Sequence, residues 1–524
     1  MIKYICAGMF VVSTSAVHAD TMTADAQRML NRLGFSAGAV DGAYGRNTRD
    51  AIERFYQSTG GAFDGSLDAN ELQDLTAAVA LLPELQTYKN FTLEQLELEG
   101  LNTPLIVSGF YDQRPSGGTM QGFKSVLPDN AWIGVMSDYD FDGDGVRDKI
   151  FAAATTPDNH YGWGTGGVSD DERRRTGWCE GECRNAYALP LFFKGLGNNE
   201  FQYVPGAIRD TRANPGITSP QRMQPADFNG DGVLDFIIND HGWNHTGNYI
   251  GEPAAYYLSQ PDGTWLESSA THMNNGRAFA NFNHGIAVGD IDADGDIDIV
   301  ETTISRQNQG SIWCRVNDGT GRMSVRACSP SNLQGWGLAV SDLDNDGCND
   351  IVNVGSPSVY RSQFSGVLWG NCTGNFRGAR STIPDKGTQR DQPDNWSETI
   401  AVWTADLDGD GDSDIITSNV GTLYVGAALQ VIENLGNRQF ASRGMLVYNT
   451  PPATAEGVRN CHRGTEGNPC GGMVHNIHLR DVNSDGRIDL VMVGSDRYTN
   501  IVYTNMGNFN FSQGRGGHPA RHLQ

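Results

Sequence analysis

The sequence predicts a mainly β protein, a seven-bladed β-propeller with six blades as the alternative, preceded by a small three-helix domain. Two observations favour the propeller. Glycine supplies 65 of 524 residues while proline, at 20, is not raised, which is typical of many short strands joined by tight turns. An acidic loop motif also recurs six times between apolar, β-branched runs. The net charge of −24 argues against a nucleic-acid-binding protein, which needs a basic face for phosphates.

Residues 1–19 have the pattern of a secretory signal peptide. Lys3 supplies the positive start, an apolar stretch follows, and Val17-His18-Ala19 is a small-x-small cleavage site. We therefore expect an exported chain, located in the periplasm, in the cell envelope or outside the cell. Beyond this segment no stretch of 18 apolar residues occurs, so we expect no membrane span.

The cysteines are consistent with export. Without Cys6, eight remain, an even number that favours disulfides in an oxidising compartment. A zinc cluster is the rival interpretation, but Cys179-x3-Cys183 has no second matching pair nearby. Sequence alone does not fix the connectivity, and pairing of nearest neighbours is the economical hypothesis: Cys179 with Cys183, Cys314 with Cys328, Cys348 with Cys372 and Cys461 with Cys470.

Residues 20–76 predict the helical domain. Apolar residues over 24–35 recur at helical spacing and end at Gly34, Thr48 is an expected N-cap of a second helix, and Leu72 and Leu75 mark a third. Residues 77–104 form an acidic linker, and the propeller is expected over 105–524.

The helical domain resembles the peptidoglycan-binding domain of bacterial cell-wall enzymes. The resemblance runs through Leu33-Gly34-Phe35, Asp41-Gly42, Tyr44-Gly45 and Thr48 to Asp64-Gly65, although Tyr56 stands where the family usually has Gln. It implies peptidoglycan as a partner of this domain. The candidate peptidoglycan-binding residues are Asp41, Gly42, Tyr44, Gly45 and Thr48.

The acidic motif has Asp at position 1, Asp or Asn at 3, Asp at 5, Gly at 6 and Asp at 9. Oxygens at positions 1, 3, 5 and 9 and the backbone carbonyl at 7 can converge on one cation, and the glycine permits the turn. The candidate metal ligands of the six loops, including each position 7, are Asp140, Asp142, Asp144, Val146, Asp148; Asp227, Asn229, Asp231, Val233, Asp235; Asp290, Asp292, Asp294, Asp296, Asp298; Asp342, Asp344, Asp346, Cys348, Asp350; Asp406, Asp408, Asp410, Asp412, Asp414; and Asp481, Asn483, Asp485, Arg487, Asp489.

The spacing favours calcium. An EF-hand would have its last ligand at position 12 and flanking helices, whereas here a carboxylate stands at 9 between apolar strands. Many oxygen ligands on a flexible loop suit Ca²⁺ better than Mg²⁺. Without cations each cluster would repel itself, and six calcium ions would bring the net charge from −24 to −12. Six acidic turns without metal are the alternative.

Each loop belongs to a larger unit of four short strands, the pattern of a propeller blade. The units resemble the VCBS/FG-GAP repeats, whose relatives include the integrin α-subunit propellers, over about residues 105–515. This resemblance implies about six structural calcium ions. Residues 105–127 hold additional strand patterns without a loop, which favours seven blades over six.

In the resembled family the metal loops share one face of the propeller, and the opposite face carries the longer connections. The candidate ligand-binding residues on that opposite face are Trp163, Trp178, His241, Trp243, His245, His284, Trp336, Trp396 and His475. A recognition or adhesion module that binds a glycan or a protein is the first hypothesis. An enzyme acting on envelope polysaccharide or peptidoglycan, and a structural protein without a small ligand, are the others. No catalytic residue is identified, because outside the metal loops no nucleophile elbow, metalloprotease motif or paired carboxylate occurs.

Overall fold

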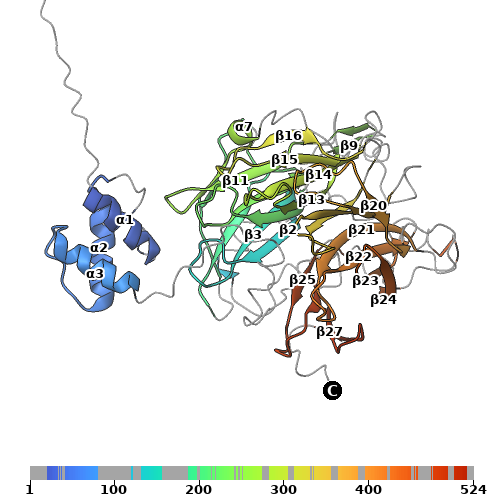
Figure 1. The fold of residues 1–524 in the computed structure, drawn as a ribbon. Helices are drawn as coiled ribbons and strands as arrows, with labels where there is room; N and C mark the ends of the chain where they lie inside the picture. The colour runs from blue at the N-terminus through green and yellow to red at the C-terminus, as the bar shows by residue number, and fades with distance from the viewer. Residues whose placement is uncertain are drawn as a thin grey trace, which may run out of the picture. The chain divides into compact units, whose positions relative to one another are not determined.

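The fold is described from a computed structural model in which the chain divides into two compact units, one with the helices of the small domain and one with all the strands (Figure 1). The structure describes the backbone of residues 21–33, 35, 37, 42–80, 120–121, 131–155, 187–197, 201–213, 215–218, 220–240, 243–245, 248–250, 252–273, 282–304, 312–330, 333, 335–355, 364–386, 396–421, 425–449, 454, 456–457, 474, 476–493 and 501–515. The expected signal peptide and most of the expected linker lie outside these residues. In the described part of the chain, no helix is long and apolar enough to cross a membrane.

The small domain contains the three expected helices, α1 (Thr21–Arg32), α2 (Arg46–Thr59) and α3 (Ala69–Ala80). Leu30, Ile52 and Leu75 are fully buried and form its core. The expectation that Thr48 caps α2 is wrong, because Gly45 is the N-cap and Thr48 lies inside the first turn.

Six sheets form the blades of the propeller among the described residues, numbered here in chain order. Their strands are β2 (Ala131–Tyr139), β3 (Asp148–Thr155), β4 (Leu191–Gly195) and β5 (Phe201–Tyr203) in blade one; β7 (Pro220–Ala226), β8 (Asp235–Asp240), β11 (Ala255–Ser259) and β12 (Trp265–Glu267) in blade two; β13 (Phe282–Gly289), β14 (Asp298–Ile304), β15 (Ile312–Val316) and β16 (Ser324–Ala327) in blade three; β17 (Gly337–Ser341), β18 (Asp350–Val354), β19 (Gly366–Leu368) and β20 (Arg380–Thr382) in blade four; β21 (Trp396–Ala405), β22 (Asp414–Gly421), β23 (Ala427–Asn434) and β24 (Phe440–Asn449) in blade five; and β25 (Asn476–Arg480), β26 (Asp489–Val493), β27 (Ile501–Asn505) and β28 (Phe511–Arg515) in blade six.

Within each blade these four strands pair antiparallel in chain order, as β21 to β24 show in Figure 1. Among the described residues the propeller therefore has six blades, the predicted alternative, and not the seven that the sequence analysis favoured. Of residues 105–127, which carry the additional strand patterns, the structure describes only 120–121, and these form β1 (Met120–Gln121), which pairs in parallel with the outer strand β5. A similar short strand, β6 (Ile208–Arg209), pairs with the outer strand β12 of blade two.

Three smaller elements belong to the chain of blade two or follow it: two strands lie between β8 and β11, and a short helix follows β12. Strands β9 (Trp243–His245) and β10 (Asn248–Ile250) form a separate hairpin, and the short helix α7 (Ser269–His272) follows blade two. The sequence did not predict these elements.

Apolar side chains fill the spaces between neighbouring blades. Separate clusters of buried residues join blades one and two, two and three, three and four, four and five, and five and six. Blade six also contacts blade one. The ring of Tyr139 in β2 lies 6.3 Å from that of His478 in β25, and Arg480 donates to the carbonyl of Asp138. These contacts close the ring between blade six and blade one.

Candidate functional site

The six acidic segments, called loops one to six, each join the first and second strands of a blade and therefore lie at one face of the propeller. The glycine at position 6 has a positive φ in all six, from 83° at Gly145 to 94° at Gly411. Position 4 is also left-handed, and in loops three, four and six a non-glycine residue occupies it: Ala293, Asn345 and Ser484. This second left-handed position was not predicted from the sequence.

Backbone N–H groups orient the acidic side chains at positions 1 and 5 of each loop. The Asp at position 1 accepts a hydrogen bond from the glycine at position 6, for example Gly232 to Asp227 at 2.7 Å. The Asp at position 5 accepts one from position 7, for example Val233 to Asp231 at 2.8 Å. The same two contacts occur in all six loops, so the carboxylates are held in one arrangement.

The Asp at position 9 connects each loop to the third strand of its blade. In loop three, Asp298 accepts from the N–H of Ile291 at 2.9 Å with one oxygen and from that of Asn317 at 2.8 Å with the other. The equivalent two bonds form in every blade. Burial raises the pKa of all six of these carboxyls, for example to about 8 at Asp298 and to about 7 at Asp350.

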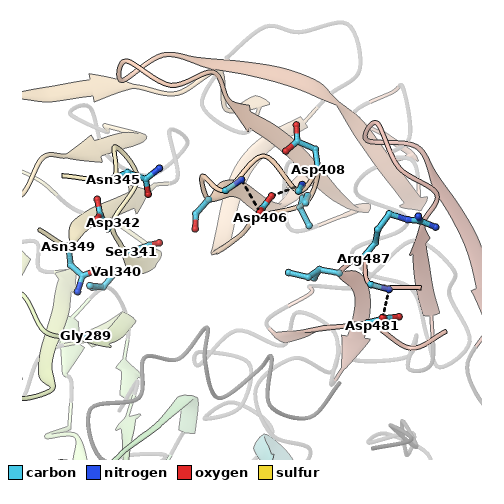
Figure 2. A pocket seen from close by; sticks show the side chains of 16 residues that line it. Gly289, Val340, Ser341, Asp342, Asn345, Asn349, Asp406, Asp408, Asp481 and Arg487 are labelled. Atoms are coloured by element: carbon cyan, nitrogen blue, oxygen red, sulfur yellow. Dashed lines mark hydrogen bonds between the residues drawn. The ribbon is translucent and has the colours of Figure 1, made fainter. Parts of the chain in front are cut away.

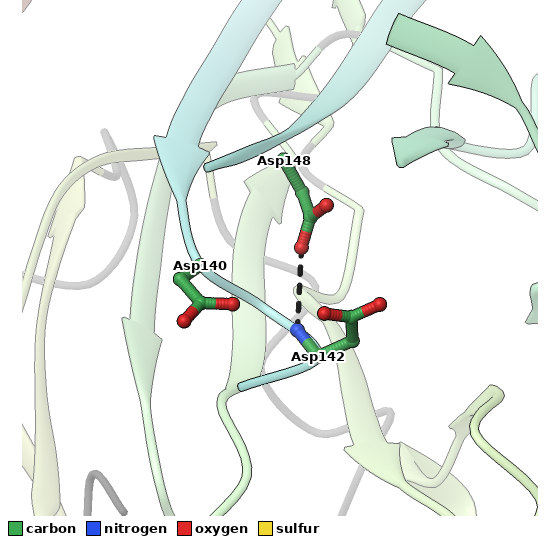
Figure 3. Close-up of side chains that lie close together, drawn as sticks. All are labelled: Asp140, Asp142 and Asp148. Atoms are coloured by element: carbon green, nitrogen blue, oxygen red, sulfur yellow. Dashed lines mark hydrogen bonds between the residues drawn. The ribbon is translucent and has the colours of Figure 1, made fainter. Parts of the chain in front are cut away.

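Acidic oxygens converge within the loops. In loops one, three, four and five, three carboxylates each place one oxygen within 4.8 Å of the others. Figure 3 shows this group in loop one, with Asp140 and Asp142 below Asp148. Loops two and six carry Asn229 and Asn483 at position 3, so they offer one carboxylate fewer.

Three loops hold buried carboxylate oxygens without a hydrogen-bond donor. These atoms are Oδ1 of Asp292 at position 3 of loop three, Oδ1 of Asp344 at position 3 of loop four, and Oδ1 of Asp412 at position 7 of loop five. A buried carboxylate oxygen without a partner is costly, and a bound cation would satisfy it. These residues therefore fit a divalent cation with a preference for oxygen ligands, which agrees with the expected calcium.

Basic side chains approach several loops. Arg326 lies 3.4 Å from Asp292, and Arg438 of blade five donates to Asp344 of loop four at 2.6 Å. In loop one, Lys194 of β4 contacts both Asp142 and Asp144. In the described part of the chain, no basic side chain pairs with the carboxylates of loop five.

Buried asparagines connect each of several loops to the next blade. Asn317, Asn434 and Asn505, at the ends of their third strands, donate through Nδ2 to the position-2 carbonyl of the preceding blade's loop at 2.6–2.7 Å. Asn349, a half-buried residue within loop four, makes a related contact with the preceding blade by donating to the carbonyl of Asp290, position 1 of loop three, at 2.7 Å. Sequence reasoning missed this role, although the Asn-x-Gly pattern at 317, 434 and 505 is a signal for it.

A cavity of about 560 Å³ lies beside the loops of blades four, five and six. Asp342, Asp406 and Asp481, the first positions of three loops, approach it from three blades, and Arg487 also lines it (Figure 2). The loop face is therefore strongly acidic at this cavity.

Of the candidate ligand-binding residues expected on the opposite face, the structure places three side chains. His284 stacks on Trp336 with ring centroids 4.3 Å apart, and Trp336 and Trp396 are buried. The packing of these two tryptophans within the protein leaves their ring faces unexposed. For Trp243 and His245 only the backbone in β9 is described, and Trp163, Trp178, His241 and His475 lie outside the described residues.

Arg222 of β7 connects three blades near these aromatic residues. It donates to the carbonyl of His284 at 3.0 Å and to that of Ile400 at 2.6 Å. Because blades two and five are opposite in a ring of six, this side chain crosses the central channel. Burial lowers the pKa of the guanidinium to about 10, so it remains charged at neutral pH.

In the small domain, Gln27 organises the candidate peptidoglycan-binding segment. Its amide donates to the carbonyl of Ala43 and to the hydroxyl of Thr48, and it accepts from the N–H of Gly42. Thr48 is buried, whereas Tyr44 is 42% exposed. Tyr44 is thus the candidate that presents a large side chain to a ligand, and Asp41 lies outside the described residues.

Comparison with known families agrees with both resemblances. Residues 21–75 match the model of a putative peptidoglycan binding domain, and residues 227–301 match that of an FG-GAP-like repeat. No curated protein sequence matches the chain.

Solved structures show only a distant likeness. A thermostable family-43 glycoside hydrolase is 8% identical, with a TM-score of 0.33 over 63% of this chain and 98% of that one. The Dos1 propeller is 9% identical, with a TM-score of 0.33 over 72% and 79%. A family-43 arabinoxylan arabinofuranohydrolase from Bacillus subtilis, in complex with cellotetraose, is 12% identical, with a TM-score of 0.21 over 43% and 49%. Scores this low carry no argument about activity.

Proposed function

We propose that the chain is an exported recognition module of the cell envelope, held to peptidoglycan by its N-terminal domain and presenting a calcium-stabilised propeller. The observation that carries the proposal is the presence of a peptidoglycan-binding domain and a β-propeller in one chain, an arrangement that fits a cell-envelope module. Two disulfides, Cys314–Cys328 and Cys348–Cys372, agree with the expected nearest-neighbour pairing and support an oxidising compartment. Cys179, Cys183, Cys461 and Cys470 lie outside the described residues.

Calcium has a structural role in this proposal. Each loop supplies a nearly complete set of protein oxygens, which leaves little room in the coordination sphere for a substrate. The ligands at positions 1, 3, 5 and 9 lie between the first two strands of a blade, and position 9 is bonded to the third. A cation there would hold three strands of the blade together.

The propeller supplies the recognition surface. A rigid scaffold with long connections on one face concentrates variable side chains there, while the loop face has an acidic cavity. A glycan or a protein is the proposed ligand class, because the long connections expected on the opposite face carry polar and aromatic residues, which suit both.

Binding to purified peptidoglycan sacculi tests the role of the N-terminal domain. The full chain without residues 1–19 should sediment with sacculi, and a chain that begins at residue 100 should remain in the supernatant. Tyr44→Ala should weaken sedimentation several-fold, because it removes an exposed aromatic side chain. Glu53→Ala, on an exposed position of α2, is the matched control and should sediment as the parent does. Equal sedimentation of the long and short chains would contradict the assignment.

A glycan array with the intact chain, in calcium and in chelator, tests the propeller. Selective binding in calcium that a chelator abolishes is the expected result. Release of products from peptidoglycan or envelope polysaccharide fragments would instead favour the enzyme hypothesis. Absence of both binding and turnover would favour the structural one.

A further inference from the structure

We infer that loop one takes no calcium ion, because Lys194 supplies an internal cation in its place, so that the chain binds five calcium ions rather than six. This inference rests on the proposal that the other loops bind calcium. It concerns the first blade alone and follows from the contacts of one side chain.

The ammonium of Lys194 lies between two of the presumed ligands. It donates to Oδ2 of Asp142, at position 3, and to Oδ2 of Asp144, at position 5, where the distance is 2.7 Å. The other oxygen of Asp142 accepts from the N–H of Asp144 at 3.3 Å. Both oxygens of the position-3 carboxylate are therefore satisfied by the protein itself.

Arginines approach loops three and four, but each of these loops keeps a carboxylate oxygen without a donor. Arg326 and Arg438 each approach one oxygen of the position-3 carboxylate, and Oδ1 of Asp292 and of Asp344 remains buried without a donor. The side chains of Arg326 and Arg438 are about two-fifths exposed and that of Lys194 about one third, so the difference between the loops lies in the carboxylate oxygen that has no donor and not in exposure. Loops three and four thus keep an oxygen for a metal that loop one does not offer.

The local backbone explains why Lys194 reaches so far into loop one. Its neighbour Gly195 donates to Asp148 at 2.8 Å, and a Cβ on Gly195 would stand 2.1 Å from the carbonyl oxygen of Arg147. Only a glycine permits strand β4 to pass this close to the loop. Lys194, which precedes this glycine, therefore lies in a strand that holds its backbone beside loop one.

The equivalent position in the other blades carries no cation. The residue that precedes the donor to position 9 is Leu258, Val316, Trp369, Glu433 and Thr504 in blades two to six. In blade five this residue is an acid, and its charge acts on the nearby carboxylate of Asp408. Because Glu433 is itself paired with Arg443, the position adds a positive charge to loop one alone.

Charge and geometry together exclude the metal. An ammonium is a compact point charge with three donors, so it can satisfy two carboxylates at once. A divalent ion in the same group of oxygens would stand a few ångströms from this charge, where like charges repel strongly in a partly buried site.

Native mass spectrometry of the intact mature chain tests the inference by counting bound calcium ions. We expect five ions on the parent and six on Lys194→Met, which removes the charge but keeps the length of the side chain. Arg326→Met is the matched control and should leave the count at five, because loop three keeps a carboxylate oxygen for the metal beside that arginine. Glu433→Lys transfers the cation to blade five and should lower the count to four.

The outcomes distinguish a failure of the internal cation in loop one from a failure of calcium binding as a whole. Six ions on the parent, or equal counts on the parent and Lys194→Met, would overturn the internal cation and leave calcium binding intact. No bound ion on any of the chains would overturn calcium binding itself. Thermal melting gives a second readout: in chelator, Lys194→Met should melt below the parent, and calcium should abolish most of the difference.

Discussion

The position-9 aspartate combines two roles. It lies at the ligand end of the loop, and its two oxygens also accept from the loop backbone and from the third strand. The sequence predicts this residue as a ligand from its spacing. Its bonds to the third strand could not be predicted, since they depend on a partner 19 residues further along the chain.

Asp298→Asn and Asp294→Asn should therefore differ in their dependence on calcium. Asp298→Asn replaces one acceptor oxygen by an amide N–H that faces a backbone N–H, so it should lower the free energy of unfolding by about 2 kcal/mol even in chelator. Asp294→Asn removes one charge from a repelling cluster, so it should cost stability only when calcium is present. Urea unfolding with and without chelator measures both, and equal losses in chelator would contradict the assigned roles.

Among the contacts between elements, the hydrogen bonds that buried asparagines make between neighbouring blades were not predicted from the sequence. The strand order of each blade follows from the apolar runs around the loops, and the structure confirms it. The hydrogen bond from Asn434 to Leu343 joins residues 91 positions apart, and no local pattern encodes such a contact. The edge strands β1 and β6 have only two residues each, too few for a periodic signal.

Asn434→Ala should weaken the junction between blades four and five. The change removes the two Nδ2 bonds, to Leu343 and Ser413, and leaves buried carbonyls without donors, a cost of about 1–3 kcal/mol. Thermal melting in calcium checks the size of the loss. Asn510→Ala, at an exposed turn position outside the left-handed region, is the control for an asparagine without this contact; matching losses would show that the junction bond contributes nothing.

At the scale of the whole molecule, calcium is expected to be a folding ligand. Sites of extracellular type with a Kd of about 0.1 mM each contribute about 1.4 kcal/mol at about 1 mM free calcium. Five such sites would add about 7 kcal/mol, which is comparable to the stability of an ordinary domain. Excess chelator should therefore lower the melting temperature by a large step, and an unchanged melting curve would contradict calcium binding.

The number of blades was harder to predict than their type. Six loops indicate six blades, but strand-like segments before the first loop also fit a seventh. Whether a ring closes depends on how the first and last blades pack, which here involves Tyr139, His478 and Arg480. These contacts join residues more than 300 positions apart, and local sequence carries no trace of them.

The closure between blades six and one has a mechanical consequence. Every blade is built from its own strands in chain order, so in the described sheets no strand from one end of the propeller completes the blade at the other end. If the small domain is fixed to a wall and a ligand pulls on the propeller, tension enters the chain just before blade one. The closure would then open first, and the blades would unravel in order from the first, each releasing its own length of chain. Extension under an optical trap should accordingly show discrete steps of about one blade.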